Sequence, residues 1–534
     1  MVAGDWVETN YTDWYGPRRA GVEGLQLGEP RPTRMSVKLS RLLAFAAAVA
    51  VAAPLSAQIT QAEYAARRAA LAKSLPGDGV LLVIGAPEPK ENFQNFWQAE
   101  NFRYLTGFLE PEAALVIVRR NGVETGMLFV QPKNPGQEVW TGERLGVDGV
   151  KPLTGLQGRD ASALRGVLDS LLAEGGALYA VGDFNAGGAD VPGTAKPKSV
   201  DDQFLDAIKA RHKDVKVVDA DANVSRLRGR KSPAELALLR SAAKVSAAAH
   251  KEVLHAIAPG MAEFEIQALA EYTFRRNGAD GPSYGSIVGS GPNSTTLHYD
   301  KDDRFMKDGE VLNMDMAAYY RGYSADLTRT VPVNGKFSPE QRAVYTIVQQ
   351  AQAAAERQVR PGVRFAQLND SAVTVLKNGL AKLGLIESPD ATYDCGTTER
   401  TYRCPQFTLY YMHGLGHPIG LDVHDVDAYA ANALIEGSVF TIEPGIYVRA
   451  NTVEIIADTP ANAALKAKIA PAVKKYANIG VRIEDDYIVT ANGFDRITAD
   501  APRDMDEIER EMAKRVGPSP RDAAQVEAYK KVKP

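Results

Sequence analysis

A chain of 534 residues is too long for one ordinary domain, so its length predicts two or three domains. Hydrophobic residues make up 45% of the chain and charged residues 24%, which is the composition of a soluble globular protein. The net charge is only −4 and no basic stripe is present, which argues against nucleic acid as a partner.

The first 57 residues have the pattern of a leader. From Met35, two basic residues precede an apolar run over 42–53, and small residues follow up to Ala57. This is the layout of a secretory signal peptide, and the run is too short for a confident membrane span. An uncleaved anchor helix is the alternative. We expect export to the periplasm or the medium, without stable membrane association. The ranges expected are 1–34 for a mis-assigned start and 35–57 for the signal peptide.

The next region predicts an α/β domain, because apolar runs such as GVLLVIG and AALVIV alternate with segments of helical pattern. Ser232, Pro233 and Glu235 then form a capping-box pattern at the start of a long Ala-rich helix. We place the domain boundary just before this helix. Beyond it, helices alternate with paired strands, and the chain ends in a charged helix and a polar tail of disorder-like composition. The boundaries expected are 58–229, 230–502 and 503–534.

The clearest pair of strands surrounds Arg321 and Gly322, which predict a two-residue turn. With that turn, Ala317 lies opposite Asp326, and Asp315 is on the same face two residues away. The two carboxylates are then diagonal neighbours, with Cβ atoms about 7–8 Å apart or less. Such a pair can converge on two metal ions. An exposed polar face is the alternative.

Cys395 and Cys404 are the only two cysteines of the chain and lie nine residues apart. In an exported protein this spacing favours a disulfide that closes a small loop. Two unpaired thiols are the alternative, because sequence does not test the geometry.

The stretch HGLGHPIGLDVHD holds three of the seven histidines: His413, His417 and His424. A fourth, His298, follows a Gly-rich loop. One histidine in such a place is ordinarily structural, but three within thirteen residues indicate a site that needs ligands or proton carriers.

Two further acids stand in strand-like contexts. Glu443 ends an apolar run, and Glu484 lies in another run with Arg482 two residues before it, on the same face. Together with the two aspartates and the histidines, these acids form a ligand set that is mostly oxygen with one imidazole. Such a set suits Mn²⁺, Co²⁺ or Zn²⁺ as a pair.

These residues stand in the order and the contexts of a known family. The segments D…YRGYSADLTRT, HGLGHPIGLDVHD, TIEPGIY and GVRIEDD resemble the ligand segments of the metallopeptidases with the pita-bread fold. Within that group, the chain is most similar to proline-specific aminopeptidase P and prolidase. NFRYLTGFLEPEAALVIV and PGQEVWTGERLG resemble the aminopeptidase P N-terminal domain. The resemblance covers roughly residues 60–515. It implies a two-domain α/β protein with an N-terminal creatinase-like α/β domain and a C-terminal pita-bread α+β domain.

The resemblance also implies the metal ligands. His417 and Glu443 would bind one divalent ion and Asp315 the other, while Asp326 and Glu484 bridge the two. Mn²⁺ is the metal expected, with Co²⁺ or Zn²⁺ as alternatives. A water between the ions, with a lowered pKa, would be the nucleophile.

The same resemblance implies five catalytic residues. Glu443 would also carry protons. His298 and His424 would position the scissile carbonyl and stabilise the tetrahedral intermediate, and His413 would lie beside the proline subsite. Arg482 would orient a metal-bound carboxylate.

The activity implied is that of an Xaa-Pro aminopeptidase acting on proline-containing peptides, in a homo-oligomer (dimer or tetramer). An Xaa-Pro dipeptidase is the alternative, because the 41 residues from Glu443 to Glu484 include an insert of prolidase-like length with a helix start at Thr459 and Pro460. The insert would be a lid that narrows the site or a surface decoration. A non-catalytic binding protein is disfavoured, because all five ligands are present.

Overall fold

The computed structural model describes residues 58–91, 94–183, 198–396, 402–426, 433–517 and 522–532. The expected mis-assigned start and signal peptide, 1–57, lie outside the described residues. Among the residues described, no helix has the length and apolar character needed to span a membrane.

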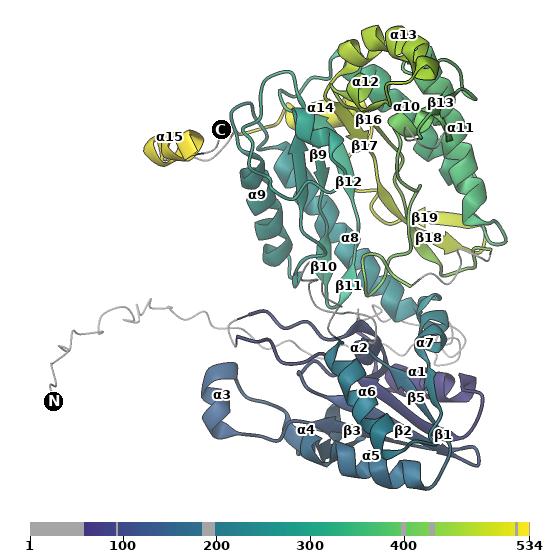
Figure 1. Cartoon of the computed structure of the whole chain (residues 1–534). Coiled ribbons are helices and arrows are strands. Elements are labelled where there is room, and N and C mark those ends of the chain that lie inside the picture. Colours follow the sequence, from purple (N-terminus) through teal and green to yellow (C-terminus); the bar gives the residue numbers. More distant parts are fainter. Residues whose placement is uncertain are drawn as a thin grey trace, which may run out of the picture. The chain divides into compact units, whose positions relative to one another are not determined.

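A six-stranded mixed sheet organises the N-terminal α/β domain (Figure 1). Its strand order is β4-β3-β2-β1-β5-β6; β1/β2 and β2/β3 are antiparallel, and the other pairs are parallel. The two apolar runs quoted from this region form β1 and β2, as predicted. The strands are β1 (Gly79–Ile84), β2 (Ala114–Arg120), β3 (Val123–Val130), β4 (Gln157–Asp160), β5 (Ala177–Val181) and β6 (Val217–Asp219).

Alternation along β1 explains why helices cover both faces of this sheet. Val80 and Leu82 point to one face and pack in an apolar cluster with Leu168 of α5. Leu81 points to the other face, into the cluster that contains Leu71 of α1. All five side chains are at most 1% exposed. The helices of this domain are α1 (Gln61–Ser74), α2 (Glu100–Thr106), α3 (Pro135–Thr141), α4 (Gly146–Thr154), α5 (Leu164–Ala173), α6 (Val200–Arg211) and α7 (Asp221–Arg228).

The long helix α8 begins where the capping box predicts. The Ser232 Oγ accepts a hydrogen bond from the Glu235 N–H at 3.2 Å, and the Ser232 N–H donates to Glu235 Oε2 at 2.8 Å. These two bonds satisfy backbone N–H groups that have no partner within the helix, and Pro233 at the first helical position has no N–H to satisfy. The main helices of the C-terminal domain are α8 (Pro233–Leu254), α9 (Glu263–Arg276), α10 (Pro339–Glu356) and α11 (Phe365–Leu383).

Short sheets make up the rest of the C-terminal domain. Helix α8 contacts β10 and β11, α9 contacts β7 and β8, and α10 contacts β15, β16 and β17 (Figure 1). The strand orders are β11-β10-β7, β12-β9-β8, β15-β18-β19, β16-β17 and β13-β14. The strands are β7 (Gly281–Pro282), β8 (Ile287–Ser290), β9 (Val311–Asp315), β10 (Ala318–Tyr320), β11 (Tyr323–Ser324), β12 (Thr328–Pro332), β13 (Thr392–Asp394), β14 (Arg403–Pro405), β15 (Val439–Ile442), β16 (Gly445–Val448), β17 (Ile479–Arg482), β18 (Asp485–Thr490) and β19 (Gly493–Arg496).

The predicted turn and register of the hairpin are confirmed. Arg321 and Gly322 have φ values of 48° and 89°, as a two-residue turn of the primed kind requires. Tyr320 pairs with Tyr323, and Asp315 pairs with Thr328, so one register runs through the hairpin. The arms are nevertheless divided between two sheets.

The second arm of the hairpin is divided between β11 and β12, which belong to different sheets, and this division has a physical cause. The Asp326 N–H donates to the carboxylate of Asp486 at 3.1 Å instead of to a strand partner. The hydrogen bonds between the two arms are therefore interrupted at Asp326.

The insert between β16 and β17 folds as α12 (Thr452–Ile455) and α13 (Pro460–Tyr476), and α13 starts where it was expected. Its apolar side chains, such as Leu465 and Ile469, join the main core of the C-terminal domain. Its buried Asn462 exchanges two hydrogen bonds with the backbone of Asp394 in β13, at 2.9 and 3.0 Å. The insert is thus a packed part of the domain.

Two further expectations are decided by the fold. Cys395 and Cys404 form a disulfide at the β13–β14 hairpin, which confirms the favoured pairing. The charged helix is α14 (Met505–Met512). Within the tail, however, a helix α15 (Ala523–Val532) is present, so the disorder-like composition was misleading there. The half-buried Tyr529 packs edge-on against the rings of Phe264 and Phe305, and this contact ties the mostly exposed helix to the C-terminal domain.

Candidate metal centre

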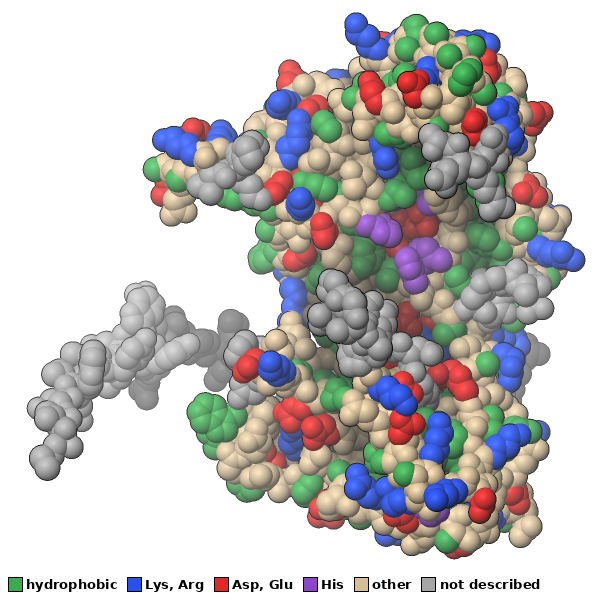
Figure 2. Space-filling view, viewed as in Figure 1, with side chains coloured by type: hydrophobic (Ala, Val, Ile, Leu, Met, Phe, Trp, Pro, Cys, Tyr) green, Lys and Arg blue, Asp and Glu red, His purple; other side chains and the backbone are tan. Residues whose placement is uncertain are grey.

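All nine residues proposed for the site line one cavity of about 510 Å³ in the C-terminal domain. They come from segments far apart in the sequence. Histidine and acidic side chains gather in the hollow of the face drawn in Figure 2. The nine residues are His298, Asp315, Asp326, His413, His417, His424, Glu443, Arg482 and Glu484.

Most of the expected ligands stand at strand ends. Asp315 is the last residue of β9, and Glu443 directly follows β15. Glu484 was expected inside a strand, but it lies in the break between β17 and β18. The break is explained by the Glu484 N–H, which donates to the Thr328 carbonyl of β12 at 3.1 Å.

Oxygen and imidazole atoms converge closely at the centre of this group. Ligand atoms of Asp326, His417 and Glu484 all lie within 4.8 Å of one another. His417 Nε2 is 3.4 Å from Asp326 Oδ2 and 3.5 Å from Glu443 Oε1. The Tyr284 hydroxyl lies 2.5 Å from Asp315 Oδ1 and 2.6 Å from Asp326 Oδ1. Six side chains, the five expected ligands and Tyr284, are therefore held in one cluster.

His417 is held with one ring nitrogen facing this cluster. Its Nδ1 lies 3.1 Å from the Pro418 carbonyl and carries the hydrogen in that contact, so Nε2 is the nitrogen that faces the acids. When protonated, Nε2 can donate to these acids; when deprotonated, it can bind an ion. Its backbone N–H donates to the Thr441 hydroxyl at 3.1 Å. At Gly416 the backbone passes so close to β15 that a Cβ would lie 2.1 Å from the Thr441 carbonyl oxygen. Glycine is required there for the segment to reach the cluster.

Arg482 contacts a carboxylate of another strand, Asp315 at the end of β9. Its guanidinium lies 2.6 Å from Asp315 Oδ2 and donates to the Tyr447 hydroxyl at 3.1 Å and to the Thr328 hydroxyl at 3.2 Å. The Thr328 hydroxyl in turn donates to Glu484 Oε2 at 2.6 Å. Arg482 is 3% exposed, so these contacts fix two of the carboxylates in a nearly dry environment.

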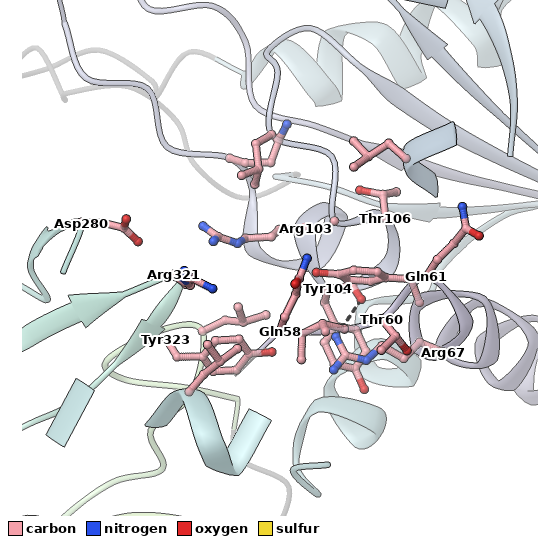
Figure 3. A pocket seen from close by; sticks show the side chains of 18 of the residues that line it. Gln58, Thr60, Gln61, Arg67, Arg103, Tyr104, Thr106, Asp280, Arg321 and Tyr323 are labelled. Carbon is pink, nitrogen blue, oxygen red and sulfur yellow. Dashed lines mark hydrogen bonds between the residues drawn. The ribbon is translucent and has the colours of Figure 1, made fainter. Parts of the chain in front are cut away.

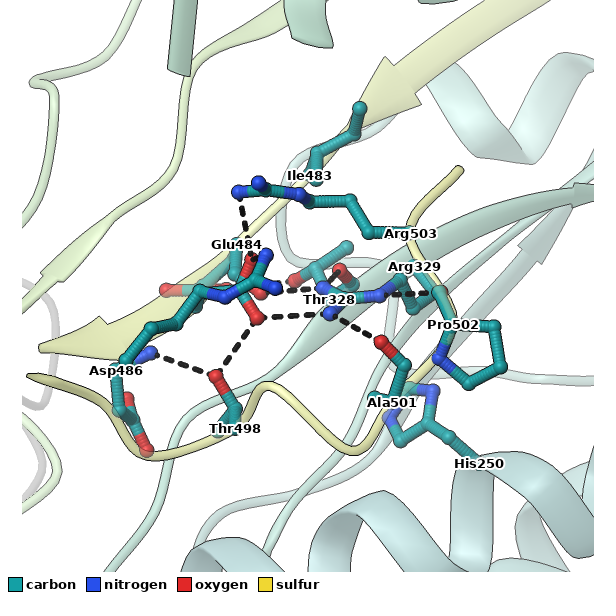
Figure 4. Close-up of polar contacts among 12 residues, drawn as sticks. His250, Thr328, Arg329, Ile483, Glu484, Asp486, Thr498, Ala501, Pro502 and Arg503 are labelled. Carbon is teal, nitrogen blue, oxygen red and sulfur yellow. Dashed lines mark hydrogen bonds and ion pairs between the residues drawn. The ribbon is translucent and has the colours of Figure 1, made fainter. Parts of the chain in front are cut away.

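A second buried arginine, Arg329, supports the backbone that carries Glu484 (Figure 4). It donates to the Glu484 carbonyl at 2.7 Å, forms an ion pair with Asp485 at 2.7 Å, and donates to the carbonyls of Ala501 and Pro502. Its charge, with other arginines, lowers the pKa of Asp485 although burial alone would raise it. The sequence analysis did not identify Arg329 and Tyr284 as part of the site, because a single Arg in a strand or a single Tyr in a loop has no sequence pattern that indicates such a role.

The metal-free cluster is electrostatically unfavourable. Burial, followed by repulsion from neighbouring acids, raises the pKa of Glu484 well above its ordinary value. Burial likewise raises the pKa of Asp315 and raises that of Glu443 to about 7. For His417, burial opposes the charged form, but the carboxylate of Asp326 raises its pKa to about 9. Such a set of acids ionises fully only beside a cation, so the donor chemistry fits divalent metal ions.

The three remaining histidines surround the cluster. His413 Nδ1 lies 2.8 Å from the Gly414 carbonyl, and its Nε2 lies 2.8 Å from the Tyr447 hydroxyl. Burial lowers the pKa of His413 to about 4, so its ring is neutral at pH 7. The ring of His424 is 4.2 Å from that of His417, and His298 is exposed at the rim.

A larger cavity of about 930 Å³ lies apart from these residues (Figure 3). The start of α1, helix α2 and the turn at Arg321 line it, and none of the nine site residues does. Its lining holds three arginines and one carboxylate, Asp280, which does not suit a divalent cation. The donor chemistry therefore identifies the smaller cavity as the candidate metal centre.

Comparison with known proteins agrees with this picture. Residues 237–491 match the model of metallopeptidase family M24, and residues 64–179 match that of the aminopeptidase P N-terminal domain. The chain is 33% identical to the Xaa-Pro aminopeptidase of Escherichia coli over 85% of this chain and 98% of that protein. It is 31% identical to human Xaa-Pro aminopeptidase 3, over 85% and 86% of the two chains.

Solved structures give the same result for the fold. The structure of E. coli aminopeptidase P with the inhibitor Pro-Leu matches with a TM-score of 0.71 at 30% identity, over 85% of this chain and 99% of that one. An aminopeptidase P from Pseudomonas aeruginosa matches with a TM-score of 0.70 at 33% identity, over 85% and 98% of the two chains. The expected two-domain fold is confirmed.

Proposed function

Because the chain belongs to metallopeptidase family M24, we propose that it is an Xaa-Pro aminopeptidase, which releases the N-terminal residue from peptides with proline in second position. The observation that carries this proposal is the convergence of nine residues from distant segments on one cavity, with the chemistry that such hydrolysis needs. The similarity to Xaa-Pro aminopeptidases over nearly their full length supports it.

Two divalent metal ions are the cofactors proposed, and Mn²⁺ is the metal we expect. When bound, such ions polarise the scissile carbonyl and make a water molecule acidic enough to attack it at neutral pH. Five residues would hold them: His417 and Glu443 on one side, Asp315 on the other, and Asp326 and Glu484 between.

Glu443 is the residue we assign to proton transfer. Burial raises its pKa to about 7 in the metal-free chain, and it lies beside His417 and His413 at the cavity wall. Its carboxylate would accept a proton from the attacking water and pass it to the proline nitrogen. That nitrogen carries no hydrogen in the peptide bond, so it leaves readily only once it is protonated.

The three histidines would act on the substrate. His298 and His424 reach the cavity from two separate segments of the chain. Both would donate hydrogen bonds to the oxygen of the scissile carbonyl as it gains negative charge. His413 is neutral and is fixed by Tyr447, so it offers the proline ring a flat, weakly polar surface. Ile287 and Leu297 add an apolar wall to the same cavity.

The experiment that tests this function compares two substrates with the same first residue. Protein beginning at Gln58 and reconstituted with Mn²⁺ would be assayed on an Xaa-Pro dipeptide and on an Xaa-Pro-Yaa-Zaa tetrapeptide. We expect faster release of the first residue from the tetrapeptide and no release by a matched Asp326→Asn variant. Activity confined to the dipeptide would instead make the protein an Xaa-Pro dipeptidase.

The insert does not favour the dipeptidase alternative. Among the described residues that line the cavity, none belongs to α12 or α13, and α13 packs into the domain core. We therefore propose that the insert is a structural addition and that the site stays open to longer peptides.

The remaining proposals concern the chain outside the site. We propose a domain division near residue 230, export directed by 35–57, and a homo-oligomer.

Fractionation of cells that express the whole chain, followed by mass measurement of the recovered protein, tests export and cleavage. Light scattering on the purified protein tests the oligomer.

A further inference from the structure

The segment that carries His424 has little support from regular secondary structure. Between Pro418 and Asp425 the backbone folds back on itself, with Gly420 N–H donating to the Asp422 carbonyl and Asp425 N–H donating to the Pro418 carbonyl, each at 2.9 Å. His424 is exposed towards the cavity, whereas Asp425 is 6% exposed. Backbone hydrogen bonds tie Ile419 to Val439 and Gly420 to Ser324, and beyond Gly420 the place of the imidazole depends on what holds its buried neighbour Asp425.

Asp425 is held between two cations of the inter-domain linker. Lys231 Nζ lies 2.6 Å from Asp425 Oδ2, and Arg228 donates to Asp425 Oδ1 and, at 2.6 Å, to Asp422 Oδ2. Lys231 also donates to the Arg228 carbonyl at 2.8 Å. Arg228 ends α7 and Lys231 precedes α8, and the two are 3% and 5% exposed. The buried cluster thus joins the linker directly to the segment of His424.

Gly420 shows how closely the segment covers this cluster. A Cβ at that position would lie 2.0 Å from Asp425 Oδ2 and 2.9 Å from Lys231 Cε. Only glycine lets the backbone pass over the ion pair, so the segment and the two cations form one packed unit.

Stability alone is a weak reason for such a cluster. Desolvation of buried charges offsets most of their attraction, and apolar replacements are often as stable. The two domains are also joined by another buried ion pair, Arg67 with Glu235 at 3.3 Å, which does not touch the segment of His424. The feature that distinguishes the Asp425 cluster is its position beside a histidine of the cavity.

We propose that Asp425, held by Arg228 and Lys231, is a positioning residue that fixes the imidazole of His424 over the metal-ligand cluster. The proposal rests on the proposed Xaa-Pro hydrolysis. The ring of His424 lies 4.2 Å from that of His417, one of the proposed ligands. A displacement of a catalytic group by about 1 Å can lower turnover by about 100-fold.

The test is a double-mutant cycle on the Mn²⁺-loaded full-length protein. Asp425→Asn keeps the shape of the side chain and removes its charge. We expect about a 100-fold lower kcat on an Xaa-Pro tetrapeptide, a KM within about threefold of wild type, and an unchanged metal content. In the His424→Ala background, Asp425→Asn should lower the residual kcat no further. A wild-type kcat in Asp425→Asn, or the same loss in both backgrounds, would overturn the proposal.

A second pair of variants separates positioning from folding. Lys231→Met should lower kcat as Asp425→Asn does, and Lys231→Arg, which keeps the charge, should restore it to within about threefold. The control is Glu235→Gln, which weakens the other inter-domain pair and should lower the melting temperature at unchanged kcat. If it lowers kcat as much as Lys231→Met at an equal loss of melting temperature, the cluster only joins the domains and the proposal fails. An inactive wild type would contradict the proposed function instead.

Discussion

The N-terminal sheet and the metal centre are both built on strands, yet they are stabilised in opposite ways. In the sheet, the side chains of β1 and β5 are apolar on both faces and almost fully buried. At the centre, the strand ends carry buried acids whose pKa values are raised by burial and mutual repulsion. The first region gains free energy from burial alone, whereas the second gains it only when a cation joins it.

The two regions differ in what each needs in order to be stable. A sheet filled with Val and Leu is stabilised by apolar burial and needs no ion. The centre keeps Asp315, Glu443 and Glu484 at a distance where they repel. Two buried arginines hold two of these acids: Arg482 contacts the carboxylate of Asp315, and Arg329 contacts the backbone of Glu484. Stability given up at the centre is the physical basis of an affinity for metal.

The largest effect is expected when one acid of the centre loses its charge. Glu484→Gln changes the proposed bridging ligand, so hydrolysis of an Xaa-Pro tetrapeptide should fall by about 10³-fold, equivalent to about 4 kcal/mol of transition-state stabilisation. In metal-free protein the same change should raise the unfolding midpoint, because it removes a buried carboxyl whose ionisation is opposed by burial and by the neighbouring acids. Initial rates and thermal unfolding after dialysis against a chelator measure both. A metal-free variant less stable than metal-free wild type would contradict the comparison.

A smaller effect, of the opposite kind, is expected in the sheet. Leu82 is fully buried in β1, so Leu82→Ala should lower the free energy of unfolding of the N-terminal domain by about 2–5 kcal/mol through the cavity it leaves. The loss should be equal with and without Mn²⁺, because no metal ligand lies in this domain among the residues proposed. Urea unfolding followed by circular dichroism in both conditions checks this. A metal-dependent loss would show that the two regions are coupled.

The smallest effect is a pH dependence of the metal-free centre. The pKa of Glu443 is raised from 4.5 to about 7 by burial, so the folded state favours its protonated form. Its contribution to stability is full below pH 4.5 and is lost as the pH rises through 7. The unfolding midpoint of the metal-free protein should fall by about 2–4 °C over that range. Glu443→Gln should remove this part of the fall in unfolding midpoint with pH. In the wild type, Mn²⁺ should reverse the pH dependence, so that the midpoint rises with pH. A slope identical in the variant would assign the pH dependence to other groups.

Sequence reasoning was most successful where a local pattern has one physical meaning. The capping box of Ser232 and Glu235, the two-residue turn at Arg321 and Gly322, and the register that follows from it all depend on contacts between near neighbours. The pairing of Cys395 with Cys404 is of the same kind. The nine site residues were noted from their local contexts, their roles were assigned through a family resemblance carried by short segments, and the fold gathers all of them around one cavity.

The sequence by itself determined which residue types are available to the centre and in which order. Only the tertiary structure decided that Arg482 contacts Asp315, that Glu484 lies in a break between strands, and that Tyr284 and Arg329 support the acids. It also decided that α13 packs into the core, that α15 is helical, and that Asp425 is held by the linker. These contacts join residues from about 30 to nearly 200 positions apart along the chain. A local pattern holds no information about such pairs, because their energy depends on burial that exists only after the chain has folded.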